Sequence, residues 1–135
     1  MNVNSCDIGA FIACRTGTVP AARAAGARNG TAIDRGSFSS CVLSVQAGAA
    51  SGAPTAIEFG AKLQHSDDGA TDWTDYEGAE VELTEASTIA EADVDLSGAK
   101  QFIRVVESLA FTGGTTPTLG TASQVVLGGP DHLPV

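Results

Sequence analysis

Apolar and polar residues alternate with a period of two along much of this chain. The clearest stretch is AIEFGAKLQ at 56–64, in which every second residue from Ile57 to Leu63 is apolar. Successive side chains of a strand point to opposite faces, so this alternation predicts a strand with one buried face. Related patterns occur at 38–47, 73–83, 94–96, 102–111 and 123–129. About seven or eight short strands separated by turns predict an all-β fold, a single-domain antiparallel β-sandwich of jelly-roll type.

The two ends of the chain lack this alternation. Residues 1–36 show little periodicity and predict an N-terminal arm that is mostly irregular, with at most one helical turn starting at Pro20. The sandwich body is expected to span 37–128. Residues 129–135 form a tail, because its two prolines oppose further strand pairing.

The strand predicted at 102–111 is apolar on both faces. Phe102 and Val106 lie on the face opposite to Ile103 and Val105. A strand of this kind is either central in a sandwich or covered by another subunit. Phe102 and Val106 are therefore the candidates for a contact between subunits.

The stretch 64–73 predicts a hairpin turn, and its side chains raise the question of chemistry. Asp67, Asp68 and Gly69 have the side chains of a tight turn, and His65 and Trp73 are expected to pack on either side of it. His65 beside two acids resembles a general base with an orienting acid. However, no serine or cysteine stands in a nucleophile motif, so we expect no catalytic residue and no enzyme.

Two other interpretations of this hairpin are open at the level of sequence. Four acids could surround a calcium ion, but their spacing matches no EF-hand, so no metal and no other cofactor is expected. They are Asp67, Asp68, Asp72 and Asp75. Trp73 could stack on a sugar ring, although a Trp that packs within its own hairpin is more common.

Charge is distributed unevenly along the 135 residues, whose net charge is −9. Among the sixteen Asp and Glu residues, only Asp7 and Asp34 precede Glu58. An acidic body repels phosphate backbones, so direct binding of nucleic acid is not expected. The N-terminal part instead holds four arginines, of which Arg15, Arg23 and Arg28 are the candidates for contacts with an acidic partner.

The cysteines and the apolar runs indicate where the protein is made. Cys6, Cys14 and Cys41 are an odd number at irregular spacing and predict reduced thiols packed as small apolar residues. No run is long enough to cross a membrane, and the first residues lack the layout of a signal peptide. We expect synthesis in a cytoplasm and no membrane partner.

Four stretches resemble a known family. NGTAID at 29–34, KLQHSDDGATDWTD at 62–75, KQFIRVV at 100–106 and VVLGGPDHLPV at 125–135 are similar to small structural proteins of tailed bacteriophages. These are capsid accessory proteins, known as head decoration or cement proteins. The resemblance covers 29–135, and the residues before it, with Cys6 and Cys14, have no counterpart.

The resemblance implies a virion protein on the outer capsid surface, made in the host cytoplasm. Such a protein is a β-sandwich, often a homotrimer, that stabilises the capsid by binding across subunits of the major capsid protein, and other capsid accessory proteins are further possible partners. The family brings no catalytic residues. Two alternatives are a head-completion or tail structural protein and a carbohydrate-binding β-sandwich for host adhesion.

Overall fold

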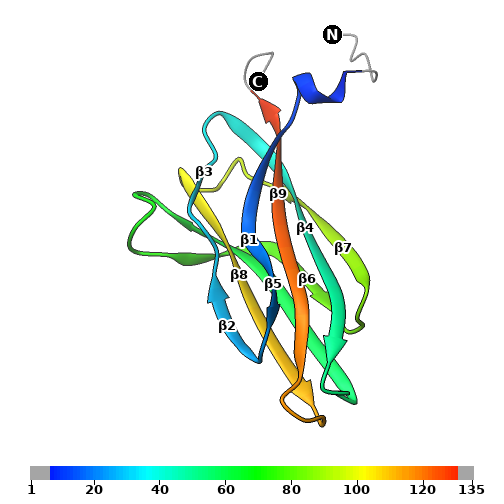
Figure 1. Cartoon of the computed structure of the whole chain (residues 1–135). Coiled ribbons are helices and arrows are strands. Elements are labelled where there is room, and N and C mark those ends of the chain that lie inside the picture. The colour runs from blue at the N-terminus through cyan, green and yellow to red at the C-terminus, as the bar shows by residue number, and fades with distance from the viewer. Residues whose placement is uncertain (1–6, 131–135) are drawn as a thin grey trace.

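The structure is a computed structural model that describes residues 7–130, so Cys6 and His132 lie outside the described part. Its elements are η1 (Ile8–Ala10), β1 (Ala13–Arg23), β2 (Gly26–Asn29), β3 (Ile33–Asp34), β4 (Phe38–Ser51), β5 (Ala56–Ser66), β6 (Thr74–Leu83), β7 (Thr88–Asp95), β8 (Phe102–Thr112) and β9 (Thr118–Pro130) (Figure 1). None of the described residues belongs to a helix with the length and apolarity that a bilayer span requires.

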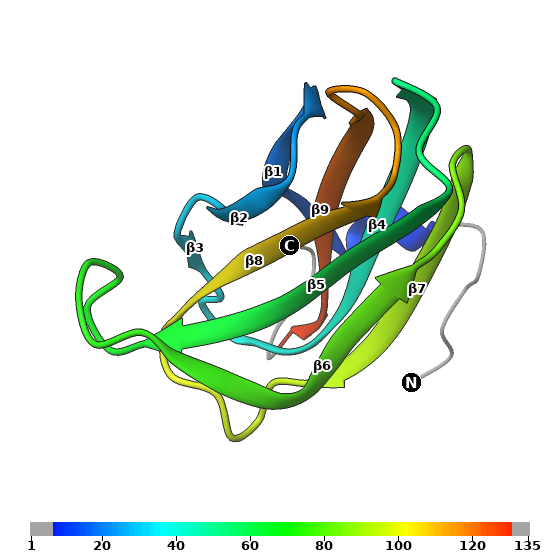
Figure 2. The ribbon, with the colours of Figure 1, turned by 90° about the horizontal axis from the view of Figure 1, so that it is seen from below.

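The strands form two sheets that face each other. One has four strands in the order β1-β9-β4-β7, and the other has the order β2-β8-β5-β6, with β3 added beside β8. Figure 2 shows the two layers from below. Every strand pair is antiparallel. The predicted all-β sandwich is confirmed.

The core lies between the two layers and follows the alternation of the sequence. In β5, Phe59, Ala61 and Leu63 are buried, whereas Gly60 and Lys62 between them face outward. The largest fully buried apolar side chains are Leu43, Val45, Phe59, Leu63, Leu96, Ile103, Val105, Leu119, Val125 and Leu127. They come from both sheets, so the two layers share one hydrophobic core.

The expectation of an irregular arm at 1–36 is wrong for most of its described part. β1 pairs with β9 along its length, and β2 and β3 pair with β8. Pro20 lies within β1 rather than at the start of a helical turn, which an edge strand tolerates. The register of β1 shifts on both sides of Thr18, and such irregularities interrupt the period-two pattern.

The C-terminal boundary also differs slightly from the expectation. β9 continues to Pro130, which pairs with Phe38 of β4. The body therefore extends two residues into the predicted tail at 129–135. Proline is compatible with this position because it lies at the very end of the strand.

The edges of the two sheets approach each other closely at Gly30. The Gly30 amide donates to the Val105 carbonyl at 2.6 Å, and the Thr31 amide donates to the Gly17 carbonyl at 3.3 Å. A Cβ at Gly30 would collide with both carbonyl oxygens. A residue without a side chain is thus required where β1 of one sheet meets the β2–β3 connection of the other.

Candidate interaction surfaces

The outer surface of the four-stranded sheet is uncharged at its centre. Its two central strands, β4 and β9, contain no charged residue. Their outward residues alternate with the core residues and pair across the strands, Val42 with Val126, Ser44 with Gln124 and Gln46 with Ala122. We call these six residues the neutral face.

The two edges of this sheet have opposite charges. β7 forms one edge and contains Glu91 and Asp93, whereas β1 forms the other and contains Arg15 and Arg23. A hollow of about 360 Å³ lies over the sheet and is lined in part by Gln46, Gln124 and the 65% exposed Ile89. The neutral face is therefore a slightly concave surface between a basic edge and an acidic edge.

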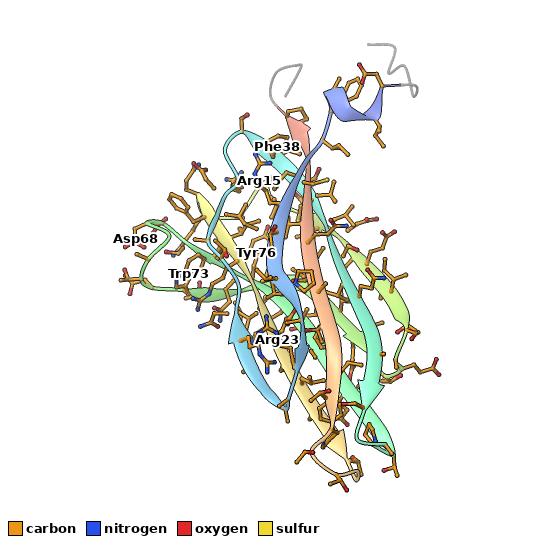
Figure 3. The ribbon with its side chains drawn as sticks, viewed as in Figure 1. Arg15, Arg23, Phe38, Asp68, Trp73 and Tyr76 are labelled. Carbon is orange, nitrogen blue, oxygen red and sulfur yellow. The ribbon has the colours of Figure 1, made fainter. Side chains whose placement is uncertain are left out.

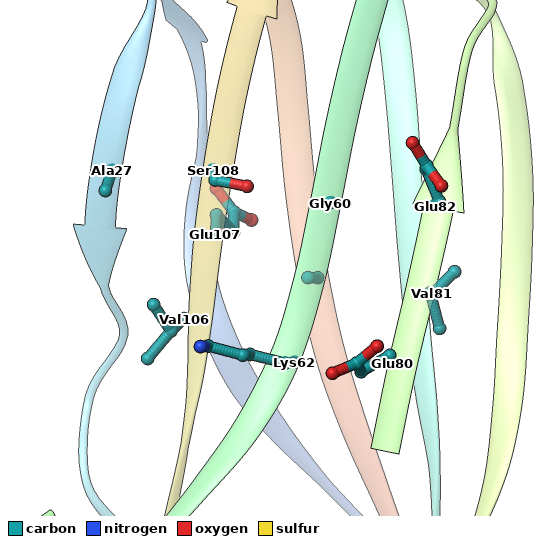
Figure 4. A pocket seen from close by; sticks show the side chains of 10 residues that line it. Ala27, Gly60, Lys62, Glu80, Val81, Glu82, Val106, Glu107 and Ser108 are labelled. Carbon is teal, nitrogen blue, oxygen red and sulfur yellow. The ribbon is translucent and has the colours of Figure 1, made fainter. Parts of the chain in front are cut away.

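The outer surface of the other sheet is charged. Glu80 and Glu82 of β6 and Lys62 of β5 line a hollow of about 570 Å³ whose floor is at Gly60 (Figure 4). Lys62 forms an ion pair with Asp75 at 2.9 Å. Charged side chains of this kind remain solvated at low cost, so the two outer faces of the sandwich differ in the free energy needed to remove them from water.

The acids of the 66–75 hairpin serve the turn rather than a common centre. Backbone amides of Thr71 and Ala70, together with the Thr71 and Ser66 hydroxyls, donate to Asp68 and hold its pKa well below the usual range. Asp75 instead accepts from Lys62 and Gln64. Within residues 7–130, no group of three or more His, Cys, Asp or Glu side chains is arranged to hold a metal ion.

His65 connects the hairpin to a neighbouring loop. Its Nδ1 accepts the backbone N–H of Lys100 at 3.1 Å, and its ring packs edge-on against Tyr76 with centroids 5.1 Å apart. Burial lowers the pKa of His65 from its ordinary value of 6.5, Lys100 lowers it further, and Asp67 opposes the shift. These contacts hold two loops together.

The lowered pKa of His65 predicts a loss of stability in mild acid. The unfolded chain takes up the proton first as the pH falls, so this contribution is complete above about pH 6.5 and is lost through the folded-state pKa. Protonation also removes the Nδ1 acceptor from Lys100. Thermal melts between about pH 8 and pH 5 should show a falling midpoint.

His65→Asn is the matched control for this effect, because its side-chain oxygen can still accept from Lys100 and does not titrate in this range. The variant should therefore show a flatter dependence of the melting temperature on pH. Equal slopes for the two proteins would contradict this role for His65.

Trp73 lies outside the hydrophobic core. The Arg104 guanidinium carbon stands 4.4 Å from the centre of the Trp73 ring, and Arg104 donates to Gln64 at 3.0 and 2.7 Å. A cation over an aromatic face is stabilising. Trp73 therefore packs on the outer side of the sheet, with one ring face covered by a side chain of its own chain.

The two candidates for a subunit contact have different surroundings. Phe102 packs against the turn, since a Cβ added at Gly69 would lie only 2.9 Å from its ring. Val106 is half-buried and borders the hollow at Gly60. Phe102 thus has a neighbour within the chain, and a contact of either residue with a second copy stays a prediction.

The structure brings together two of the three predicted contact arginines. Arg23 and Arg28 line one hollow of about 400 Å³ between β1 and β2, whereas Arg15 lies elsewhere on β1 and is exposed. Figure 3 shows Arg15 and Arg23 well separated along β1. The three arginines therefore do not form a single patch.

Glu107 is not among the residues predicted from the sequence, and it is buried in the core with an exposed fraction of 1%. The hydroxyls of Thr18 and Thr121 donate to its carboxylate, and Thr18 lies 2.8 Å from the Ser123 hydroxyl. The alternation of β8 places Glu107 between the inward residues Val105 and Leu109, so its inward direction could be predicted. Its hydroxyl partners come from distant strands.

The prediction of packed thiols is confirmed for one cysteine and wrong for another. Cys41 is buried, and this burial raises its pKa to about 12. Cys14 is exposed on the edge strand β1, where the strand has only one packed neighbour.

Comparisons with known proteins do not identify the chain. No protein-family model matches it. A search of curated proteins also finds no significant match.

Proposed function

We propose that this chain is a capsid decoration protein of a tailed bacteriophage. It is made in the host cytoplasm, binds the outside of the assembled capsid across neighbouring subunits of the major capsid protein, and stabilises the shell. The observation that carries the proposal is the neutral face. The chain has a net charge of −9, yet the two central strands of this sheet contain no charged residue.

A neutral sheet surface is suited to contact with another protein. The buried centre of a protein interface is depleted of charged residues, since each charge taken out of water must be compensated by a partner. Gln46 and Gln124 can exchange hydrogen bonds with a partner at lower cost than a carboxylate. The charged outer face of the other sheet would then remain in water.

Binding of this kind stabilises the shell by linkage. A protein that binds only the assembled capsid lowers the free energy of that state relative to free subunits. Many equivalent copies act together, so a modest contact at each position resists internal pressure over the whole shell.

The opposite charges of the two sheet edges support the proposed homotrimer. The acidic edge at β7 of one copy complements the exposed Arg15 at the β1 edge of the next. A repeated contact between two different edges closes a ring when the rotation between copies fits. Phe102 and Val106 are a second candidate contact for the same assembly.

The position of the chain in virions tests this function directly. We expect mass spectrometry of purified particles to detect the chain, and cryo-electron microscopy to show 13.6 kDa units outside the shell near three-fold positions. Virions without the chain would refute the proposal. Density confined to the neck or tail, or rings in solution, would indicate a head-completion or tail protein instead.

Adhesion to carbohydrate receives less support. Trp73 is the only Trp of the chain, and Arg104 already covers one face of its ring. Sugar binding usually needs an open aromatic face. Glycan binding that is lost in a folded Trp73→Ala variant would favour this alternative.

A further inference from the structure

The hollow between β1 and β2 has an unusual excess of positive charge. Arg23 pairs in register with Leu119, and Arg28 pairs with Glu107. Both of these partners point into the core, so the two arginines also leave their strands toward the space between the sheets. The two edges therefore bring two guanidinium groups into one hollow, which we call the arginine cleft. In Figure 3, Arg23 lies beside β2.

Backbone hydrogen bonds orient both guanidinium groups. Arg23 donates through Nη2 to the Val19 carbonyl at 3.0 Å, and Arg28 donates through Nη2 to the Ala24 carbonyl at 2.8 Å. Each bond reaches back four residues along the chain. The side chains are thereby fixed before any ligand arrives, which reduces the entropy lost on binding.

Other donors of the same groups are left without acceptors. Arg23 Nε and Arg28 Nη1 are buried and have no hydrogen-bond partner among the described residues. A buried donor without an acceptor is rare and destabilising. The ion pairs formed within residues 7–130 involve Lys62 and Lys100, so neither arginine of the cleft has a carboxylate partner there.

The acid closest in register does not neutralise the cleft. Glu107 stands opposite Arg28 across the β2–β8 pair, but its carboxylate accepts from Thr18 and Thr121 and forms no ion pair with Arg28. Thr18 also lines the cleft, which places the Glu107 network behind its wall. Two cations beside each other therefore favour an anion from outside the chain.

The surroundings indicate which anion fits. Val19 lines the same cleft and is 63% exposed, so the cleft offers an apolar contact next to the two cations. An aspartate or glutamate within a protein segment can satisfy both features. A nucleic acid would be repelled by the acidic remainder of the chain.

We propose that Arg23 and Arg28 form a binding site for a carboxylate of an acidic protein segment. A carboxylate in the hollow would accept from the guanidinium nitrogens that face it, because Arg23 Nε and Arg28 Nη1 are covered by the chain's own atoms. The inference deepens the proposed function and rests on it in one respect, since it names an acidic segment of a capsid subunit as the occupant. The preference of the cleft for carboxylates can be measured without capsids.

Titration with hexaglutamate tests the site in the full chain. Nitrogen-15 NMR spectra should show shifts of the Arg23 Nε–H signal, which inorganic phosphate produces only at higher concentration. Arg23→Gln and Arg28→Gln should each raise the dissociation constant for hexaglutamate by about tenfold. The exposed Arg15→Gln is the matched control and should leave the constant within about twofold.

Two further readouts separate a binding role from a structural one. Because the two donors have no acceptor in the folded chain, Arg28→Gln should keep or raise the melting temperature, whereas a structural arginine would lower it. Hexaglutamate that does not bind, binds all three variants equally, or binds no more tightly than phosphate would overturn the inference.

Capsid binding distinguishes this inference from the proposed function. If the wild-type chain binds hexaglutamate but does not decorate capsids, the proposed function fails and the carboxylate site stands. If Arg23→Gln/Arg28→Gln decorates capsids at full occupancy, the capsid is not the source of the carboxylate, and that part of the inference is refuted.

Discussion

Replacement of Phe59 by alanine is expected to lower the free energy of unfolding by about 3–5 kcal/mol. Phe59 is fully buried in β5, where it pairs with Leu109 of β8 on one side and with Leu83 of β6 on the other. Its ring fills the space between the sheets, so its removal takes away buried apolar area and leaves a cavity that the strands cannot close.

Urea denaturation followed by circular dichroism measures this loss. Phe59→Leu should cost less than about 1.5 kcal/mol, because most of the side-chain volume stays. Ile89→Ala, at a 65% exposed position, should change stability by no more than about 0.5 kcal/mol. A loss for Phe59→Ala as small as that for Ile89→Ala would mean that the two layers do not pack around Phe59.

Much of the sandwich could be predicted because its central strands bury one face. In β5, every second residue from Phe59 to Leu63 is buried, and the sequence alternates in the same register. The inner residues of β4 and β9 follow the same rule. For such strands, the hydrophobic pattern and the structure have the same physical cause.

The N-terminal strands could not be predicted in this way. β1 is an edge strand in which only Gly17 and Thr18 are buried, and its bulges shift the register. It is held mainly by backbone hydrogen bonds to β9, which leave no pattern in the side chains. Pro20 predicted a helical turn for the same reason, because the pairing of β1 with β9 is not visible in the side chains around it.

The candidate surfaces were predictable to different degrees. The absence of charge in β4 and β9 is visible in the sequence, but their position side by side follows only from the sheet order. The arginine cleft depends on the approach of β1 to β2 across two sheets, and Arg23 and Arg28 belong to different sheets. Long-range register of this kind has no local sequence pattern.

Gln46→Glu combined with Gln124→Glu should weaken binding to capsids by about 100-fold or more. Both residues are exposed on the neutral face, on neighbouring strands of the same sheet. The substitutions keep the size and shape of the side chains and add two negative charges. If this face is buried against capsid subunits, each carboxylate must lose its hydration without gaining a cationic partner, and this desolvation weakens binding.

Sedimentation of capsids with increasing amounts of labelled protein measures the affinity, and thermal melts should confirm that the variant folds as the wild type does. Ser108→Asp combined with Ala110→Glu is the matched control, because it adds two carboxylates to exposed positions on the outer face of the other sheet. Both variants have the same net charge, so general repulsion by the capsid weakens them equally. A selective loss in the glutamine variant therefore identifies the bound face, whereas an equal loss, or a larger loss in the control, would assign attachment to another surface.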